Sequence, residues 1–569
     1  MSTRKILGRL CRAVALVGLL ASGGMAAVTS PLDIWDMHAI VNDPLEVQVL
    51  SERVVETERG AVLERELTYR SEISRGEEIR IAAHLAMPVG EGTLPGLVIG
   101  HGHGGHGSMD MAQAYALTHK VIAVSIDGPG QGGSSGPRDC MGHWLDVLET
   151  PRHSYLYHCA VAGMRAVTYL RTLAECDPKR IGVTGGSMGG IMTLLVNGVD
   201  KRLACAVDNA ACGAWATGAR EGSWLRTLMM DGMGLAPDSA EVTTLFRYLD
   251  PVHYIPTQRS PLLIILGAQD EYFPITSLAE TVAGLRGPHR LTYIADWDHG
   301  LYTIDNPALQ TYDNSAAAAL RVNSSSKRWF DYYLHGKGEA IPRGPVLRMR
   351  AAGGAVLARA TVDEGSPVSA VRFCYSTDGA YTFTVLPMER GGGMWEARMR
   401  LGAAQAEGLA AFVEVEYEDG LFLSSRPYLG PQFRLRVRPA PFNEGTFVME
   451  RSDESAIHYL ERLKVDETLS LQDRLWQEAR LAVLWANLKR YDKALEIYNR
   501  VLEQAPQPPI DDIVPVVLWR MAEVLDRAGR RAEAVEVLER ALATWPDTPE
   551  AEAREIAQAE ALLERLRGK

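Results

Sequence analysis

A serine between glycines follows a short apolar run of the kind that forms buried strands. Residues 181–184 lead into Gly185, Ser187 and Gly189, and an apolar helical stretch begins at Ile191. A strand, a G-x-S-x-G turn and a helix form a nucleophile elbow, in which a Cβ at either glycine would collide with the adjoining strand or helix. The N-terminus of that helix directs N–H groups at the oxyanion that develops when a serine attacks a carbonyl. We therefore expect Ser187 to be a nucleophile rather than a bystander in a Gly-rich loop.

A serine nucleophile needs a general base, and the base needs a carboxylate that orients it. The apolar run 262–266 leads into Asp270, and the run 291–295 leads into His299. The order serine, aspartate, histidine along the chain is one in which catalytic triads occur. We predict that His299 is the base for Ser187 and that Asp270 orients its imidazole.

Three other carboxylates compete with Asp270 for the orienting role: Asp208, Glu271 and Asp298. Asp298 is adjacent to the histidine in the chain and would have difficulty bending back to the ring. Glu271 is the near neighbour that is most easily confused with Asp270. Asp208 and Asp298 are the weaker candidates, and Asp270 is the prediction.

A second glycine-rich segment has the composition needed for the other half of an oxyanion hole. Residues 101–107 follow the apolar run 97–100 and contain four glycines and three histidines, so their backbone can approach a ligand closely. We predict that the N–H groups of His103 and Met188 are the two oxyanion donors. Alternating histidines can also indicate a metal site. No carboxylate cluster is near them, so we expect no metal and a structural role for the imidazole of His101.

Residues 127–134 are also rich in glycine but lack the G-K-[ST] ending of a phosphate-binding loop. They open no nucleotide-binding fingerprint either. We predict a tight turn beside the active site, and we expect that the protein needs no organic cofactor.

The elements that must position these residues divide the chain into parts. Between residues 45 and 343, apolar β-branched runs alternate with helical stretches, which predicts an α/β domain with a mostly parallel sheet flanked by helices. Between 344 and 437 the period changes to two and Asp-Gly turns separate the runs, which predicts a small β-sandwich. The Pro-containing stretch 438–443 is typical of a linker.

Residues 470–569 are helical and repetitive. Two similar segments centred on Ala494 and Ala534 are 40 residues apart (534 − 494) and resemble a pair of tetratricopeptide repeats. Two repeats cannot build a long concave surface, so packing or self-association is favoured over capture of a protein partner, although both stay open.

Composition and charge exclude several classes of protein. Lys and Arg number 59 against 71 Asp and Glu, and the resulting net charge of −12 argues against binding nucleic acid or an anionic membrane surface. Seven cysteines in 569 residues are too few for a disulfide scaffold.

The first 26 residues have the three-part plan of a secretory signal peptide. A basic start that includes Arg4 and Arg12 precedes an apolar run at 13–21, and small residues follow as far as Ala26. Nine apolar residues are too few to cross a bilayer. We expect removal of residues 1–26, a secreted or periplasmic protein, and no integral membrane span in the mature chain.

An insertion between Cys212 and Ser260 is rich in soft and aromatic side chains. It contains Trp215, Trp224, Met229, Met230 and Met233. Such residues could line an acyl or leaving-group pocket, or they could simply pack a cap onto the sheet. Packing is the slightly favoured interpretation.

Taken together, the motifs at 101–105, 127–134, 177–181, 185–190, 267–270 and 299–300 resemble the α/β-hydrolase superfamily. Within it they are most similar to acetyl xylan esterase/cephalosporin deacetylase and dienelactone-hydrolase-like enzymes, over about residues 75–335. Dienelactone hydrolases proper use a cysteine nucleophile, whereas this chain has Ser187, which points to ester or amide hydrolysis. Residues 328–336 and the β-domain after them are also similar to X-Pro dipeptidyl-peptidase and cocaine-esterase relatives.

The resemblance implies a secreted serine hydrolase that cleaves carboxylic esters through an acyl-enzyme. Its expected substrate is a small-molecule ester or an acylated carbohydrate. An X-Pro dipeptidyl-peptidase-like or other serine aminopeptidase would use the same three residues on another leaving group. A noncatalytic envelope protein that binds a partner is the alternative from a different class.

Overall fold

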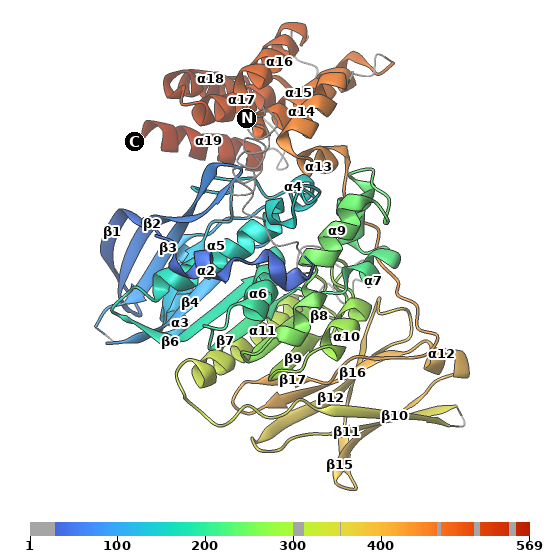
Figure 1. The fold of residues 1–569 in the computed structure, drawn as a ribbon. Helices are drawn as coiled ribbons and strands as arrows, with labels where there is room; N and C mark the ends of the chain where they lie inside the picture. Colours follow the sequence, from blue (N-terminus) through green and yellow to red (C-terminus); the bar gives the residue numbers. More distant parts are fainter. Residues whose placement is uncertain are drawn as a thin grey trace, which may run out of the picture.

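The computed structural model describes residues 29–90, 92–299, 312–352, 354–463, 468–505, 513–545 and 553–568. The predicted signal peptide at residues 1–26 lies outside the described residues. An α/β domain forms the middle of the molecule, a β-rich segment lies at one end, and a helical region lies at the other (Figure 1). The predicted fold class, an α/β-hydrolase-like domain followed by a β-rich segment and helical repeats, is confirmed.

A nine-stranded mixed sheet is the framework of the α/β domain. Its strand order is β1-β2-β3-β5-β4-β6-β7-β8-β9. The pairs from β1 through β3 to β5 are antiparallel, and all pairs from β5 through β4 to β9 are parallel. The strands are β1 (Gln48–Thr57), β2 (Gly60–Ser74), β3 (Glu77–Pro88), β4 (Leu94–Gly100), β5 (Ile122–Ile126), β6 (Cys176–Gly186), β7 (Cys205–Asn209), β8 (Leu262–Gly267) and β9 (His289–Ile294).

Helices cover both faces of this sheet, which explains why the parallel strands are continuously apolar. Every residue of β4, β5 and β8 is buried. Val98 and Ile264 face a core shared with α5 (Tyr155–Leu170), α6 (Met188–Val199) and α10 (Ile275–Ala283). Leu97 and Ile265 face the opposite core, which is shared with α3 (Met109–His119) and α11 (Tyr312–Tyr333).

The insertion between β7 and β8 forms short helices that pack against the first core. They are α7 (Trp215–Arg220), α8 (Trp224–Arg226) and α9 (Ala240–Leu249). Trp215, Met229 and Met230 are buried in that core, and Met233 packs against it from a partly buried position. These residues therefore serve the packing of the cap, the interpretation that the sequence slightly favoured.

The β-rich segment consists of two antiparallel sheets, as the period of two predicts. One has the order β10-β11-β15-β14 and the other has β13-β12-β16-β17, with β18 paired to β16. The second core of the α/β domain continues into them through side chains such as Phe373 and Val413. The elements are β10 (Val346–Ala352), β11 (Ala355–Thr361), β12 (Val368–Ser376), β13 (Thr384–Pro387), β14 (Glu389–Gly391), β15 (Met394–Arg400), α12 (Ala403–Glu407), β16 (Ala410–Tyr417), β17 (Phe422–Ser424) and β18 (Tyr428–Leu429).

The C-terminal region contains two helix pairs of the same shape. Lys489 and Gly529 take left-handed backbone conformations at the turns α15/α16 and α17/α18, 40 residues apart (529 − 489). This repeats the offset that the sequence predicts. The helices are α13 (Glu444–Met449), α14 (Asp453–Arg462), α15 (Leu471–Asn487), α16 (Tyr491–Gln504), α17 (Ile513–Arg527), α18 (Arg531–Thr544) and α19 (Ala553–Arg567). Among the described residues, none of the helices combines the length and the apolar character needed to cross a membrane.

Candidate active site

Ser187 occupies a strained turn between β6 and α6. Its backbone has φ 57° and ψ −118°, a conformation that costs a non-glycine residue about 1–3 kcal/mol. The turn has no room for side chains on either side. A Cβ at Gly185 would lie 2.6 Å from the carbonyl carbon of Gly189, and one at Gly189 would lie 2.5 Å from Gly100 O. The glycines of the G-x-S-x-G pattern are therefore required by the close contact of β4, β6 and α6.

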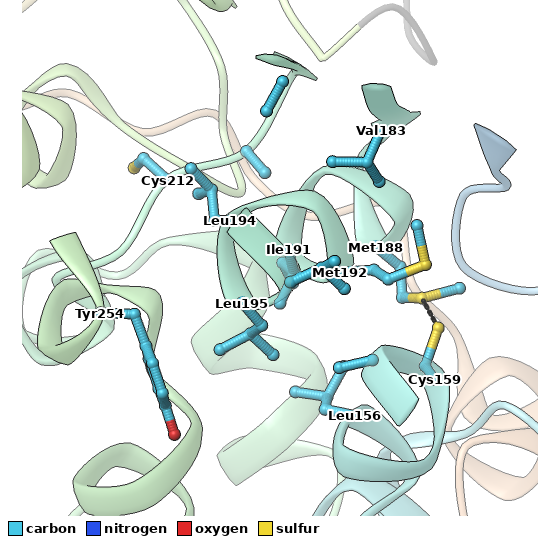
Figure 2. Packing of buried hydrophobic residues seen from close by; sticks show 14 of the residues in the cluster. Leu156, Cys159, Val183, Met188, Ile191, Met192, Leu194, Leu195, Cys212 and Tyr254 are labelled. Carbon is cyan, nitrogen blue, oxygen red and sulfur yellow. Dashed lines mark hydrogen bonds between the residues drawn. The ribbon is translucent and has the colours of Figure 1, made fainter. Parts of the chain in front are cut away.

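The helix that follows Ser187 is buried on all sides, so the turn is held rigidly. Figure 2 shows α6 with Leu194 beside Cys212, with Leu195 on the side of Tyr254, and with Met188 beside Cys159 of α5. The Cys159 thiol donates to Met188 Sδ at 3.4 Å. Met188 is the first residue of α6, so this packing fixes the direction of its backbone N–H.

The structure brings the three predicted triad residues together. His299 Nε2 lies 2.9 Å from Ser187 Oγ, and His299 Nδ1 lies 2.6 Å from Asp270 Oδ2. The other carboxylate oxygen of Asp270 accepts from the backbone N–H groups of Tyr272 and Phe273 at 2.9 and 2.8 Å. Asp270 therefore holds the ring in the tautomer whose Nδ1–H donates to the carboxylate and whose Nε2 accepts the serine proton.

Strand topology explains this convergence of distant residues. Ser187, Asp270 and His299 follow β6, β8 and β9, which run parallel, so all three lie beyond the same carboxyl edge of the sheet. Burial disfavours the imidazolium, but the charge of Asp270, aided by Glu271 and Asp298, raises the pKa of His299 above its ordinary value. A base with this pKa binds the serine proton more tightly during attack.

Asp208, one of the competing carboxylates, lies at the end of β7 without contacting the ring. It is fully buried, and within the described parts of the chain neither of its oxygens has a hydrogen-bond partner. Burial, and then the charge of Asp270, raise the pKa of Asp208 well above its ordinary value. The raised pKa favours the neutral form of Asp208, and its carboxyl group makes no hydrogen bond to the ring of His299 in the described residues.

The other two competing carboxylates share a buried arginine. Arg438 Nη1 lies 2.5 Å from Glu271 Oε1 and 3.5 Å from Asp298 Oδ2. Burial and the nearby Asp270 raise the pKa of Glu271 to about 7, and Arg438 opposes them. No local pattern indicates a role for Arg438, because it lies in the Pro-containing stretch that is typical of a linker. Glu271 and Asp298 are the chain neighbours of Asp270 and His299, so Arg438 lies between the two loops that carry these residues.

The glycine-rich segment 101–107 lies directly beside the nucleophile. A Cβ at Gly102 would lie 3.6 Å from Ser187 Cβ. Within the described residues, the backbone N–H groups of His103 and Met188 have no hydrogen-bond acceptor, which leaves them available for an oxyanion. Met188 follows Ser187 directly in the chain, and His103 follows Gly102, which lies beside Ser187.

The imidazole of His101 supports this loop. Its Nε2 accepts from Gly128 N at 2.7 Å, and its Nδ1 lies 2.8 Å from Gly102 O. Burial lowers the pKa of His101, so the ring is neutral. In the parts of the chain that the structure describes, no group of three or more His, Cys, Asp or Glu side chains is placed to hold a metal ion.

Residues 127–134 form the tight turn that the sequence predicts, and that turn braces the loop 101–107. Asp127 accepts from Gly107 N at 2.8 Å through Oδ1 and from Gly133 N at 2.7 Å through Oδ2. A Cβ at Gly132 would lie 2.0 Å from Asp127 Oδ2, so the turn closes tightly on this carboxylate.

An aromatic cluster covers one side of the base. The Tyr272 ring lies 4.6 Å from the His299 ring, and Trp224 meets Tyr272 edge-on at 5.5 Å. Phe442 meets Trp224 edge-on at 5.8 Å. Only Trp224 of this cluster was singled out in the sequence, since Phe442 comes from the stretch between the β-rich segment and α13.

Three known families match parts of the chain. The prolyl oligopeptidase family matches residues 159–317, and the acetyl xylan esterase family matches residues 47–211. A tetratricopeptide repeat family matches residues 488–554. The resemblances to acetyl xylan esterases and to tetratricopeptide repeats are confirmed, and both enzyme families point to a serine hydrolase.

Individual relatives match only parts of the chain. The uncharacterized peptidase YuxL of Bacillus subtilis is 25% identical over 232 residues, which are 40% of this chain and 34% of the relative. Acetyl esterase Axe7A of Xylanibacter ruminicola is 30% identical over 139 residues, which are 24% of this chain and 31% of the relative. The chain thus spans about a third of the length of either relative. An acetyl xylan esterase structure from Paenibacillus sp. R4 has a TM-score of 0.41 and 21% identity, over 52% of this chain and 92% of that chain.

Proposed function

We propose that this protein is a serine hydrolase that cleaves carboxylic esters with a short acyl group. The observation that carries the proposal is the hydrogen-bonded series Ser187–His299–Asp270, with distances of 2.9 and 2.6 Å. The free N–H groups of His103 and Met188 beside Ser187 supply what an oxyanion needs.

In the proposed reaction, Ser187 Oγ attacks the ester carbonyl carbon and gives its proton to His299 Nε2. The carbonyl oxygen becomes an oxyanion that accepts hydrogen bonds from the N–H groups of His103 and Met188. The bond to the alcohol oxygen then breaks, and His299 protonates the departing alkoxide. Water, deprotonated by His299, attacks the acyl-serine and releases the carboxylic acid and free Ser187.

Acetyl esters are the proposed substrate class, carried by a small molecule or a carbohydrate. The match to the acetyl xylan esterase family and the similarity to an acetyl esterase support this choice. The Tyr272 ring beside His299, with Trp224 packed behind it, adds bulk next to the proposed base, which favours a short acyl group. The proposal also places the mature protein outside the cytoplasm, on the basis of residues 1–26. Sequencing the N-terminus of the exported protein tests that placement.

An aminopeptidase is the second candidate. The prolyl oligopeptidase family match spans Ser187, Asp270 and the base His299, and one relative is named a peptidase. The same residues would then cleave an amide. Release of p-nitroaniline from dipeptide anilides, without turnover of p-nitrophenyl acetate, would favour this candidate over the esterase.

Labelling with a fluorophosphonate tests the proposed function directly. We expect the wild type to be labelled and the Ser187→Ala variant not to be, with a loss of at least about 10³-fold in kcat on p-nitrophenyl acetate and an unchanged Tm. Ser239→Ala is the matched control, because Ser239 only caps α9. Acetyl, butyryl and longer esters then rank the acyl groups. A wild type that neither labels nor turns over any ester would leave the noncatalytic binding protein as the better description.

A further inference from the structure

His103, whose N–H is a proposed oxyanion donor, has its side chain held between two carboxylates. Its Nδ1 lies 2.8 Å from Asp139 Oδ1, and its Nε2 lies 2.8 Å from Glu450 Oε1. Glu450 follows α13 in the segment that joins the β-rich part to the helical repeats, 347 residues away in the chain. The proposed reaction assigns no role to either carboxylate.

Asp139 fixes the loop on one side of His103. Its side chain is fully buried, and Oδ1 also accepts from Trp144 Nε1 at 2.8 Å. Its Oδ2 accepts from the backbone N–H of Gly104 at 2.8 Å. One carboxylate therefore holds both the imidazole of His103 and the peptide group that follows it.

Glu450 fixes the other side of the ring and is itself held firmly. Its Oε2 accepts from Met141 N at 2.9 Å, and its backbone carbonyl accepts from Gly142 N at 2.7 Å. The contact between the two segments is close, since a Cβ at Gly142 would lie 2.3 Å from Ser452 N. The carboxylate of Glu450 is therefore a fixed acceptor rather than a mobile surface group.

The protonation state of the ring matches this arrangement. Burial disfavours the imidazolium of His103, but the charges of Asp139 and Glu450 outweigh burial and raise its pKa well above the ordinary value. Both ring nitrogens can then donate to carboxylates, in bonds that are about twice as strong as neutral ones. The Trp144 ring packs edge-on against the imidazole at 5.6 Å and completes its surroundings.

We propose that Glu450 is a positioning residue for the oxyanion site: by holding the imidazole of His103, it sets the direction of the N–H groups in loop 101–107. The inference rests on the proposed function for its catalytic consequence. It makes the segment that leads into the helical repeats a working part of the active site. Preorganised donors stabilise a transition state only when they are held in place before the reaction, and Glu450 supplies that support.

A merely structural role for the same contact makes different predictions. If Glu450 only docks the C-terminal segment, Glu450→Ala should change activity and hydrogen exchange no more than the removal of another docking contact does. Asp453 provides the matched control, because it lies on the same segment, pairs with Arg138, and does not touch His103. Asp453→Ala removes a docking contact and leaves the carboxylate on the ring intact.

Hydrogen exchange of the full-length protein tests the positioning independently of catalysis. The N–H groups of Gly104, Gly105 and Gly107 are hydrogen-bonded within or behind the loop and report its order. We expect Glu450→Ala to accelerate their exchange at least about fivefold and Asp453→Ala to leave it unchanged. Equal exchange in the wild type and Glu450→Ala would overturn the proposal.

Kinetics test the catalytic consequence. We expect Glu450→Ala to lower kcat on p-nitrophenyl acetate by about 10- to 100-fold and to keep KM within about threefold of the wild-type value. This fall in kcat is smaller than the fall expected when a whole oxyanion donor is removed. Glu450→Gln keeps an oxygen acceptor for the ring, and we expect it to recover most of the rate. A kcat equal to that of the wild type, or an equal loss in Asp453→Ala, would overturn the role of Glu450.

Tm and fluorophosphonate labelling distinguish a failure of the positioning role of Glu450 from a failure of the proposed function. A fall in Tm shared by Glu450→Ala and Glu450→Gln, with parallel loss of activity, would mean that the residue serves folding, and it would overturn the positioning role. If the wild type shows neither fluorophosphonate labelling nor ester turnover, the proposed function fails. The exchange measurement would then still decide whether Glu450 holds the loop.

Discussion

Arg438 Nη1 lies 2.5 Å from Glu271 Oε1, and both side chains are almost completely buried. The same two residues meet at Trp224, whose N–H donates to Glu271 O at 2.9 Å and whose indole Nε1 donates to Arg438 O at 2.7 Å. Glu271 is next to Asp270 in the chain. The cap, the loop that holds the acid and the segment after the β-rich part are thus joined at one buried point.

Replacing Arg438 with methionine should destabilise the protein strongly. The change leaves Glu271 buried without its partner, and breaking a buried ion pair from one side typically costs about 3–5 kcal/mol. We expect a lower Tm and a further rise in the pKa of Glu271. The double variant Arg438→Met/Glu271→Gln should recover part of the Tm, because it removes the uncompensated carboxylate. Thermal melts of the wild type, Arg438→Met and the double variant measure these changes. If the double variant recovers none of the lost Tm, this account is contradicted.

Replacing Asp270 with asparagine should reduce kcat by about 10³- to 10⁴-fold, because an amide favours the wrong tautomer of His299. His299 must be neutral to accept the serine proton, and its pKa is raised. The wild-type kcat/KM should therefore fall as the pH drops through a value above the ordinary 6.5. Without the charge of Asp270, this acidic limb should move to lower pH. Rates of fluorophosphonate labelling against pH measure the shift, and an unmoved limb would argue against the assignment.

Asp208→Asn should have little effect on activity, in contrast to Asp270→Asn. Asp208 makes no hydrogen bond to His299 and its raised pKa favours the neutral form, which an amide resembles, so we expect kcat/KM within about threefold of the wild type. The pKa of Asp208 is higher in the folded protein than in the unfolded chain, so the unfolded chain loses this proton first as the pH rises. The free energy of unfolding therefore falls as the pH rises above about 4. This contribution should vanish in the variant. Tm measured from pH 5 to pH 9 should therefore decline less steeply in Asp208→Asn than in the wild type.

Phe442→Ala should widen the range of acyl groups. Phe442 packs edge-on against Trp224, which contacts Tyr272 beside the catalytic ring. Removing a phenyl ring frees space that a longer acyl chain can occupy, so the ratio of kcat/KM for butyrate over acetate should rise at least about threefold. Phe383→Ala is a matched control, because Phe383 packs against Phe412 of the β-rich segment instead. The same change of ratio in both variants would contradict a local effect of Phe442.

Local patterns were sufficient to predict much of the fold and the triad. Continuous apolar runs indicated the parallel strands because both faces of the sheet are covered, and alternation indicated the strands around Phe373 and Val413. The G-x-S-x-G spacing around Ser187 indicated the elbow, because a turn this tight between a strand and a helix requires glycines. Asp270 was singled out because it follows a strand directly.

The choice between the carboxylates and the supports of the site depended on tertiary packing. Asp208 also lies at the end of a strand, and only the packed structure shows that it is buried without contacting the ring and that its pKa is raised. Arg438 begins the stretch 438–443, which has the composition of a linker, and Glu450 directly follows α13. They carry no local signal, because their partners are more than 100 residues away and are met only when the helical segment docks on the α/β domain.

The amino-acid sequence by itself therefore determined the strand–turn–helix that exposes Ser187, and the order in which acid and base follow it. These features depend on spacing and on steric limits within short segments. Tertiary structure alone decided which carboxylate holds the histidine, how the loop at His103 is clamped, and which distant charges are buried beside it. Those outcomes depend on the balance of desolvation and pairing between separate parts of the chain, which no local pattern contains.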